Sequence, residues 1–341
     1  MARWNRGFPT AAGRGLLGGG MAAVVLMACA THVARGGERP TPNAVVAADG
    51  SGDFTSVQEA IGKAPMKTGT DDPRWVILVK PGTYRERIHV QRERGNMLVM
   101  GEDAETTTIV FNMHANMPGE DSKPIGTFRT PTVWIDGDGM EWRDITMAND
   151  AGPVGQALAL RVDGDRVAFR RCRFLGWQDT ILVNRGRQYF ADCFIEGHVD
   201  FIFGGATCFF DRCRIHCLKD GYITAASTPD GTPHGYVFAD CTITGEGDTR
   251  TYLGRPWRDF AKTVFLRTEM ADVVRPEGWH DWNKPHAHDT AFYAEYGSTG
   301  PGGNTEQRVD WAKTLTADEA ATLTPDRVLG GTDGWNPTEE R

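Results

Sequence analysis

The chain has 341 residues, 40% of them hydrophobic, and a formal net charge of −8 at pH 7. This composition is typical of a globular protein, and the negative charge argues against non-specific nucleic-acid binding. Glycine is abundant, with 41 residues, which suits a fold that turns sharply many times. We therefore expect a globular protein of one long or two shorter domains, without a nucleic-acid partner.

The first 30 residues have the pattern of a signal peptide. Three arginines precede an apolar run over residues 16–30, and no acidic residue occurs before Glu38. The run is too short and too rich in glycine for a stable membrane span. This pattern predicts an exported protein.

Two routes of processing remain open for this segment. Residues 28–30 fit an ordinary signal peptidase site, whereas residues 26–29 resemble a lipobox in which Cys29 is lipidated. The protein is then either secreted or attached to the outer membrane through a lipid on Cys29. Residues 31–43 are predicted to be a polar tether, and residues 44–341 the folded domain.

A short helix is predicted near the start of the folded domain. Ser56–Glu59 has the capping-box pattern that begins a helix, and Pro65 ends it after Ala64. Apolar runs at residues 75–79 and 97–100 predict strands after it. A helix in this place would cover the open end of a stack of strands.

A motif of four residues repeats through the middle of the chain. The copies are Phe169–Cys172, Phe190–Cys193, Phe210–Cys213 and Phe238–Cys241, with weaker copies at Trp142–Ile145 and Phe265–Thr268. The spacing is 27, 21, 20, 28 and 27 residues along this series. Such a period, without helical periodicity, is typical of an all-β stacked parallel β-helix. Successive coils are then about 4.8 Å apart.

Six cysteines follow the predicted signal peptide. Cys193 and Cys213 lie at the same phase of adjacent coils, close enough to form a disulfide in an exported protein. The other interpretation is a ladder of reduced, buried thiols that pack as small apolar side chains. No metal is expected, because Cys208, Cys213 and Cys217 are not followed by paired histidines at ligand spacing.

Two aspartates also recur at one phase of adjacent coils. Asp179 lies seven residues after one repeat cysteine, and Asp200 lies seven residues after the next. Close carboxylates push their pKa values apart, which suits one to act as an acid and the other as a nucleophile or base. Asp220 and Asp248 share the phase, so a ladder of turn aspartates is the alternative. The apolar run 201–203 beside Asp200 argues against a solvated turn.

Two glutamines are expected beside these acids. Gln178 directly precedes Asp179, and Gln156 lies about one coil earlier. Amide N–H groups can hold a developing oxyanion, while one carboxylate attacks and the other moves protons. This combination favours acyl-transfer chemistry.

The segment 253–257 adds a cation and an aromatic face. Arg255 can hold a carboxylate through two hydrogen bonds and keep it ionised, and Trp257 can offer a flat apolar surface to a sugar ring. A surface ion pair and a core tryptophan are the ordinary alternatives. After Trp279 the pattern becomes irregular, and Thr316–Glu319 predicts a last short helix.

From Val45 to Trp335 the chain resembles the pectin methylesterase (pectinesterase) family, bacterial type. The segments that carry the resemblance are Asp49–Phe54, Gly82–Glu86, Gln156–Leu160, Gly176–Thr180, Val199–Gly204, Leu253–Trp257, Gly278–Trp279 and Tyr296–Gly302. The family fold is a right-handed parallel β-helix, in agreement with the repeat. The resemblance implies a monomeric enzyme without a cofactor that hydrolyses the C6 methyl esters of polygalacturonate to pectate and methanol.

The resemblance also implies a role for each candidate residue. Asp200 is the nucleophile, and Asp179 protonates the departing methanol and then activates the water that releases the acyl-enzyme. Arg255 orients Asp200 and keeps it charged. Gln178 and Gln156 hold the oxyanion. The sugar groove is lined by Trp257 and Phe201.

Two further points concern individual positions. Bacterial members pair the cysteines that match Cys193 and Cys213, so the resemblance implies a disulfide there. Leu182 stands where the family often has Tyr or Trp, so one groove contact is expected to differ. Three rival interpretations remain: a polysaccharide lyase or glycosidase on this fold, a non-catalytic cell-surface protein, and an esterase or thioesterase with a non-pectin substrate. The glutamines and intact acids favour the pectin esterase.

Overall fold

The computed structural model describes residues 39–66 and 73–339. Residues Pro40–Arg341 form one compact unit. The predicted signal peptide, Cys29 and residues 31–38 of the predicted tether lie outside the described residues. No helix within the described ranges is long and apolar enough to cross a membrane.

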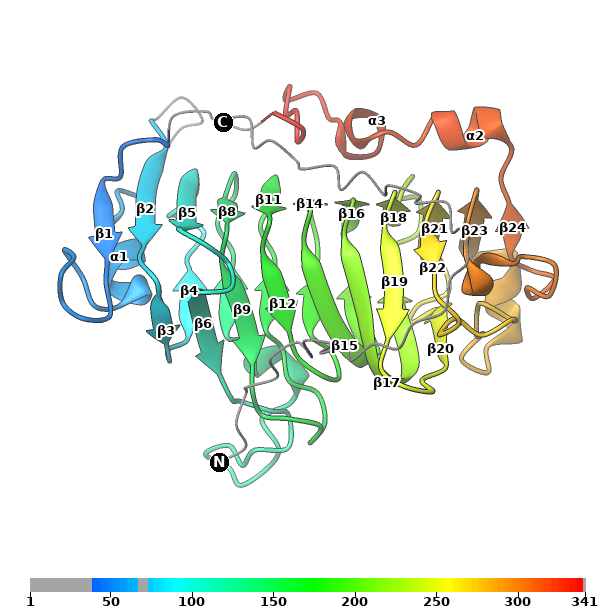
Figure 1. The fold of residues 1–341 in the computed structure, drawn as a ribbon, viewed down its shortest axis with the longest axis horizontal. Coiled ribbons are helices and arrows are strands. Elements are labelled where there is room, and N and C mark those ends of the chain that lie inside the picture. The colour runs from blue at the N-terminus through cyan, green and yellow to red at the C-terminus, as the bar shows by residue number, and fades with distance from the viewer. Residues whose placement is uncertain (1–38, 67–72, 340–341) are drawn as a thin grey trace, which may run out of the picture. The chain divides into compact units, whose positions relative to one another are not determined.

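The compact unit is a stack of coils made of short parallel strands (Figure 1). One face is an 11-stranded sheet in which each strand pairs with the strand one coil away. In spatial order these strands are β1 (Ala44–Val46), β2 (Trp75–Val79), β5 (Met97–Gly101), β8 (Glu141–Arg143), β11 (Val167–Arg170), β14 (Arg187–Ala191), β16 (Thr207–Asp211), β18 (Tyr236–Ala239), β21 (Lys262–Leu266), β23 (Phe292–Tyr296) and β24 (Lys313–Thr314).

A 13-stranded sheet forms the other two faces. It includes β3 (Gly82–Tyr84), β6 (Thr107–Phe111), β9 (Thr146–Asn149), β12 (Arg173–Leu175), β19 (Thr242–Gly245) and β22 (Glu269–Met270) on one side, and β4 (Ile88–Val90), β7 (Val133–Ile135), β10 (Leu160–Val162), β13 (Ile181–Val183) and β20 (Thr251–Gly254) on the other. The long strands β15 (Phe194–Gly204) and β17 (Arg214–Ala226) belong to both sides, because each pairs with strands of both. The predicted parallel β-helix is confirmed.

The repeat motif forms the centre of the core. Phe169, Phe190, Phe210, Phe238 and Phe265 occupy one register position of five successive strands. Their rings stack at centroid distances of 4.7, 4.7, 4.3 and 4.5 Å, and all five are fully buried. The spacing read from the sequence therefore describes the coil length correctly.

The third residue of each four-residue repeat, including the weaker copies, turns the corner of its coil. These residues have φ between 48° and 54° and alternate in charge: Asp144, Arg171, Asp192, Arg212, Asp240 and Arg267. Each arginine bonds the aspartate of the coil before it, as in the contact of Arg212 Nε with Asp192 Oδ1 at 2.9 Å. The corner is thus a surface ladder of ion pairs in the left-handed backbone region.

The predicted disulfide is wrong in this structure. Cys193 and Cys213 are both free and buried, as are the other four described cysteines. The two reduced thiols are in hydrogen-bonding contact with each other, and each also lies near main-chain carbonyl oxygens. Cys193 Sγ lies 3.4 Å from the carbonyl oxygen of Ala191, and Cys213 Sγ lies 3.5 Å from that of Phe190. The alternative interpretation, a ladder of reduced thiols, describes the molecule.

Both predicted helices form. Ser56 caps α1 (Val57–Lys63) by accepting from the main-chain N–H of Glu59. At the other end, Thr316 and Glu319 make the reciprocal bonds of a capping box at α2 (Ala317–Ala321). The helices that the sequence did not predict are α3 (Pro325–Leu329) and the 3-10 turns η1 (Thr127–Arg129), η2 (Pro285–Asp289) and η3 (Pro301–Gly303).

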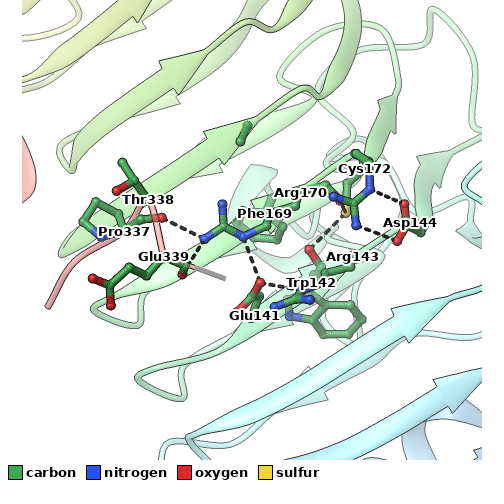
Figure 2. A network of polar contacts seen from close by, with 12 residues as sticks. Glu141, Trp142, Arg143, Asp144, Phe169, Arg170, Cys172, Pro337, Thr338 and Glu339 are labelled. Carbon is green, nitrogen blue, oxygen red and sulfur yellow. Dashed lines mark hydrogen bonds and ion pairs between the residues drawn. The ribbon is translucent and has the colours of Figure 1, made fainter. Parts of the chain in front are cut away.

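The C-terminal segment runs along the 11-stranded sheet (Figure 1). Leu315, Ala320, Val328 and Leu329 are buried in one apolar cluster with outward-facing residues of that sheet. The end of the segment is tied to the sheet by Arg170, which donates to Glu141 Oε1 at 2.9 Å and to the carbonyl oxygens of the last described residues (Figure 2). The tail is thus a packed layer of the fold.

Candidate active site

Asp179 and Asp200 lie side by side on adjacent coils. The register pairs Ile181 with Ile202, two residues beyond each acid, and the N–H of Asp179 donates to the carbonyl oxygen of Val199 at 3.1 Å. Both acids have positive φ, 62° and 51°. The pairing of β15 with β17 shifts register on both sides of Val199, and such irregularities re-aim side chains next to functional sites.

Arg255 binds Asp200 through two hydrogen bonds. Arg255 Nε donates to Asp200 Oδ1 at 2.8 Å, and Nη2 donates to Oδ2 at 2.6 Å. Burial raises the pKa of Asp200 above its ordinary value, whereas the hydrogen bond and the charge of Arg255 act to lower it. Planar two-bond contact with a guanidinium favours the ionised carboxylate. The expected pairing of Arg255 with Asp200 is therefore present.

No cation among the described residues is hydrogen-bonded to Asp179. Its side chain is buried, with the residue only 8% exposed. Burial first, and then the negative charge of Asp200, raise the pKa of Asp179 well above its ordinary value, while Arg255 opposes them from a distance. The pKa values of both acids are raised, but of the two only Asp200 has a bonded cation that opposes the rise, which suits Asp179 to be the proton donor beside an anion.

Gln156 and Gln178 stand opposite each other on adjacent coils. They form a parallel bridge, and the N–H of Ala157 donates to the carbonyl oxygen of Gln178 at 3.1 Å. Both residues are partly exposed. Gln156 thus lies one coil before Gln178, as the sequence predicted, and Gln178 directly precedes Asp179.

The aromatic side of the site differs from the prediction at one position. Phe201 is 0% exposed and belongs to the main core, so its assignment as a substrate contact is wrong. The backbone turn at Asp200 points the next side chain inward. Phe203 was not predicted from the sequence; it is buried in the cluster that contains Leu182, and the ring of Trp257 packs against this cluster, 5.7 Å from the ring of Phe203.

Two further aromatic residues were not found from the sequence. Tyr222 and Trp282 each place a ring face 3.7 Å from the Arg255 guanidinium carbon. Tyr222 pairs with Val199, next to the nucleophile candidate. The only available signal was the position of Tyr222 after an in-phase aspartate, and nothing in the local sequence of Trp282 indicated the contact.

The in-phase acids Asp220 and Asp248 lie in a different environment. Both are exposed, and Asp220 accepts the main-chain N–H of Arg250 at 2.8 Å and a bond from Arg275. Asp248 lies in a turn, whereas Asp220 lies on β17, so the turn-ladder interpretation fits Asp248 but not the buried pair. Among the described residues, no group of three or more His, Cys, Asp or Glu side chains is arranged to hold a metal.

Residues 43–332 match the sequence profile of the family described as Pectinesterase. The chain is 41% identical over 282 residues to Pectinesterase 31 of Arabidopsis thaliana, covering 81% of this chain and 88% of that protein. It is 40% identical over 308 residues to Pectinesterase/pectinesterase inhibitor U1 of Solanum lycopersicum. This match covers 85% of the chain but 51% of that relative, so the chain spans about half of its length.

Solved structures show the same similarity. The pectin methylesterase from carrot superimposes with a TM-score of 0.80 at 36% identity, covering 86% of this chain and 95% of the other. A pectin methylesterase in complex with a hexasaccharide superimposes with a TM-score of 0.74 at 29% identity, covering 88% and 100%. The range matched by the family profile includes every candidate residue of the acid site.

Proposed function

The chain belongs to the pectinesterase family and hydrolyses the methyl esters of pectin, and we propose that it does so through an acyl-enzyme on Asp200. The substrate is a methyl-esterified polygalacturonate, the class to which a hexasaccharide bound to a structural relative points. The observation that carries the proposal is the contrast within the acid pair. Asp200 holds two hydrogen bonds from Arg255, whereas the pKa of Asp179 is raised by burial and by Asp200.

In the first half of the proposed reaction, an oxygen of the Asp200 carboxylate attacks the C6 carbonyl carbon of an esterified unit. Negative charge develops on the carbonyl oxygen, and the side-chain amides of Gln178 and Gln156 donate hydrogen bonds to it. The C–O bond to the methoxy group then breaks, and protonated Asp179 transfers its proton to the departing oxygen. Methanol leaves, and an anhydride joins the sugar acid to Asp200.

In the second half, water replaces methanol. Asp179, now ionised, accepts a proton from a water molecule that attacks the C6 carbonyl carbon of the anhydride. Cleavage of the bond to the Asp200 oxygen releases the galacturonic acid unit, whose carboxyl proton then passes to solvent. Asp200 is again an anion bonded to Arg255, and Asp179 is again protonated, so the cycle closes without an added proton source.

Trp257 and Phe203 are proposed to form the apolar side of the sugar groove. Their rings lie over a buried cluster beside the acids. We further propose that the enzyme acts as a monomer outside the cell, after removal of the N-terminal segment. Mass spectrometry of the mature N-terminus, with Cys29→Ser as the comparison, tests whether a lipid is added at Cys29.

Methanol release from esterified pectin tests the activity. We expect the wild-type chain to release methanol and Asp200→Ala to release none above background. Asp220→Ala is the matched control, because Asp220 has the same phase one coil further along and is exposed on β17. Equal loss in both variants would indicate a folding defect, and full activity in Asp200→Ala would refute the assignment.

A further inference from the structure

The guanidinium of Arg255 is enclosed by two aromatic rings. Tyr222 covers one side and Trp282 another, each with its ring centroid 3.7 Å from the guanidinium carbon. The same guanidinium makes both hydrogen bonds to Asp200. Arginine stacks well on aromatic faces, and the contact strengthens when water is excluded.

Each ring is itself braced. Tyr222 stacks on Tyr252 of the next coil at 5.4 Å and 11°, and the His280 ring meets both tyrosines nearly edge-on. His280 Nδ1 also accepts the main-chain N–H of Trp282 at 2.9 Å. One imidazole therefore contacts one ring of the enclosure and positions the backbone of the other.

The loop that carries Trp282 is fastened to the loop that carries Arg255. Trp282 has a φ of 56°, a conformation that is unfavourable for a bulky side chain unless its surroundings hold it. Lys284 Nζ donates to the carbonyl oxygens of Pro256 and Trp257 at 3.2 and 2.9 Å. The ammonium thus ties both loops together beside the guanidinium.

From this geometry we propose that Tyr222 and Trp282 are positioning residues that hold Arg255 in the two-bond contact with Asp200. The inference rests on the proposed function for its kinetic consequences. An arginine side chain has several rotatable bonds and loses much freedom when it is fixed in one pose. Two ring faces restrict it before substrate arrives, so the nucleophile stays ionised and oriented.

The pH dependence follows from the groups around Asp200. The charges of Arg255 and His198 lower the pKa of Asp200. The charge of Asp200 in turn raises the pKa values of Asp179 and of buried Tyr293. Of these, only Arg255 is hydrogen-bonded to Asp200 and lowers its pKa by both the bond and its charge. A loosely held Arg255 lowers that pKa less, so the acidic limb of the pH–rate profile moves to higher pH.

The test compares Tyr222→Leu and Trp282→Leu with Tyr222→Phe and Trp282→Phe on esterified pectin. We expect each leucine variant to lose about tenfold in kcat, the size of a lost desolvated cation–π contact, with KM changed less than about twofold. The acidic limb shifts to higher pH in the leucine variants, and the phenylalanine variants recover most of kcat. Trp335→Leu is the matched control, since Trp335 lies 5.4 Å from a different arginine, Arg187.

Three results would overturn the proposal. An unmoved acidic limb in both leucine variants means that the rings do not act through Arg255. A rise in KM alone means that they contact the sugar, and equal losses in the leucine and phenylalanine variants mean a general packing role. If the wild type released no methanol, the proposed function would be refuted independently of this inference. A carbon-13 titration of the Asp200 carboxyl in wild type and Tyr222→Leu would then still test whether the rings hold Arg255 against Asp200.

Discussion

Asp179 and Asp200 occupy equivalent positions of adjacent coils, yet their surroundings differ by one guanidinium. Both are nearly buried, which disfavours a charge on either. Arg255 bonds only Asp200, so the second charge would have to form on Asp179 beside an existing anion. The proton therefore resides on Asp179, and the stacked coils convert two identical side chains into a donor and a nucleophile.

Asp179→Asn should abolish turnover without weakening the fold. Loss of the proton donor lowers kcat by roughly 10²–10⁴. Because the pKa of Asp179 is raised in the folded state, the folded protein keeps a proton at pH 7 that the unfolded chain releases, which lowers stability there, and this effect disappears below about pH 4, the unfolded pKa. We expect a melting temperature at pH 7 equal to or above that of wild type, with the difference closing on acidification.

Calorimetry from pH 7 to pH 4, together with methanol release, checks both parts of this prediction. Asp220→Asn is the control, because that acid is exposed and should change neither quantity. A variant that melts well below wild type at pH 7 would contradict the account of Asp179 as a destabilised buried acid.

Gln178→Ala should lower kcat by about 10²-fold or more, the usual effect of removing one oxyanion donor. KM should change much less, because the hydrogen bond strengthens mainly in the transition state. Steady-state kinetics on esterified pectin distinguish the two parameters. A change confined to KM would mean that Gln178 binds the sugar instead.

The strands around the site are positioned by the stacked phenylalanines behind them. Each ring contacts the rings of the coils on both sides, so the ladder sets the registry that aligns successive loops. The surface ladder of Asp and Arg at the coil corners lies beside it, but its ion pairs are solvent-exposed. The two ladders therefore differ in what they contribute to stability.

Phe210→Ala should destabilise the protein by about 3–5 kcal/mol, because it removes a buried ring that stacks on two neighbours. Arg212→Ala, two residues away, should cost only about 0–1 kcal/mol, the range of exposed ion pairs. Denaturant unfolding of both variants provides the comparison. Similar losses in the two would show that the corner ladder, and not the ring stack, fixes the coils.

The C-terminal segment connects coils that are distant in sequence. Glu141, on β8, accepts hydrogen bonds from Arg74, Arg143 and Arg170. Burial alone would raise the pKa of Glu141, but the bond from Arg143 and the three positive charges hold it below its ordinary value. Arg170 also reaches the last described residues of the tail, so one network joins the sheet to the chain end (Figure 2).

Arg170→Ala should loosen the tail and leave catalysis intact at low temperature. It leaves the carbonyl oxygens of Pro337 and Glu339 without this donor, a loss of about 1–3 kcal/mol. We expect faster proteolysis within residues 330–339 and an unchanged kcat. Limited proteolysis with mass spectrometry checks the tail, with Arg171→Ala at the exposed corner as the control. Resistance to proteolysis equal to that of wild type would show that the apolar contacts of α2 and α3 are sufficient to hold the tail in place.

Much of the fold was predictable because a solenoid repeats its local pattern. The aromatic and cysteine spacing predicts the coil, and the coil predicts that Asp179 and Asp200 are neighbours. The same reasoning failed for Phe201, since the backbone at Asp200 departs from regular strand alternation. It also failed for the disulfide, because closeness of two cysteines in register does not determine whether their thiols are joined, and Cys193 and Cys213 are both free.

The sequence by itself determined the stacked coils, the helices that begin at Ser56 and Thr316, and the pairing of the acids, since each follows from periodicity or from contacts within a few residues. Only the tertiary structure decided that Tyr222 and Trp282 enclose Arg255 and that the tail reaches Arg170. These contacts join segments about 30 to 170 residues apart through irregular loops. Their geometry depends on how separate coils pack, and no local pattern encodes it.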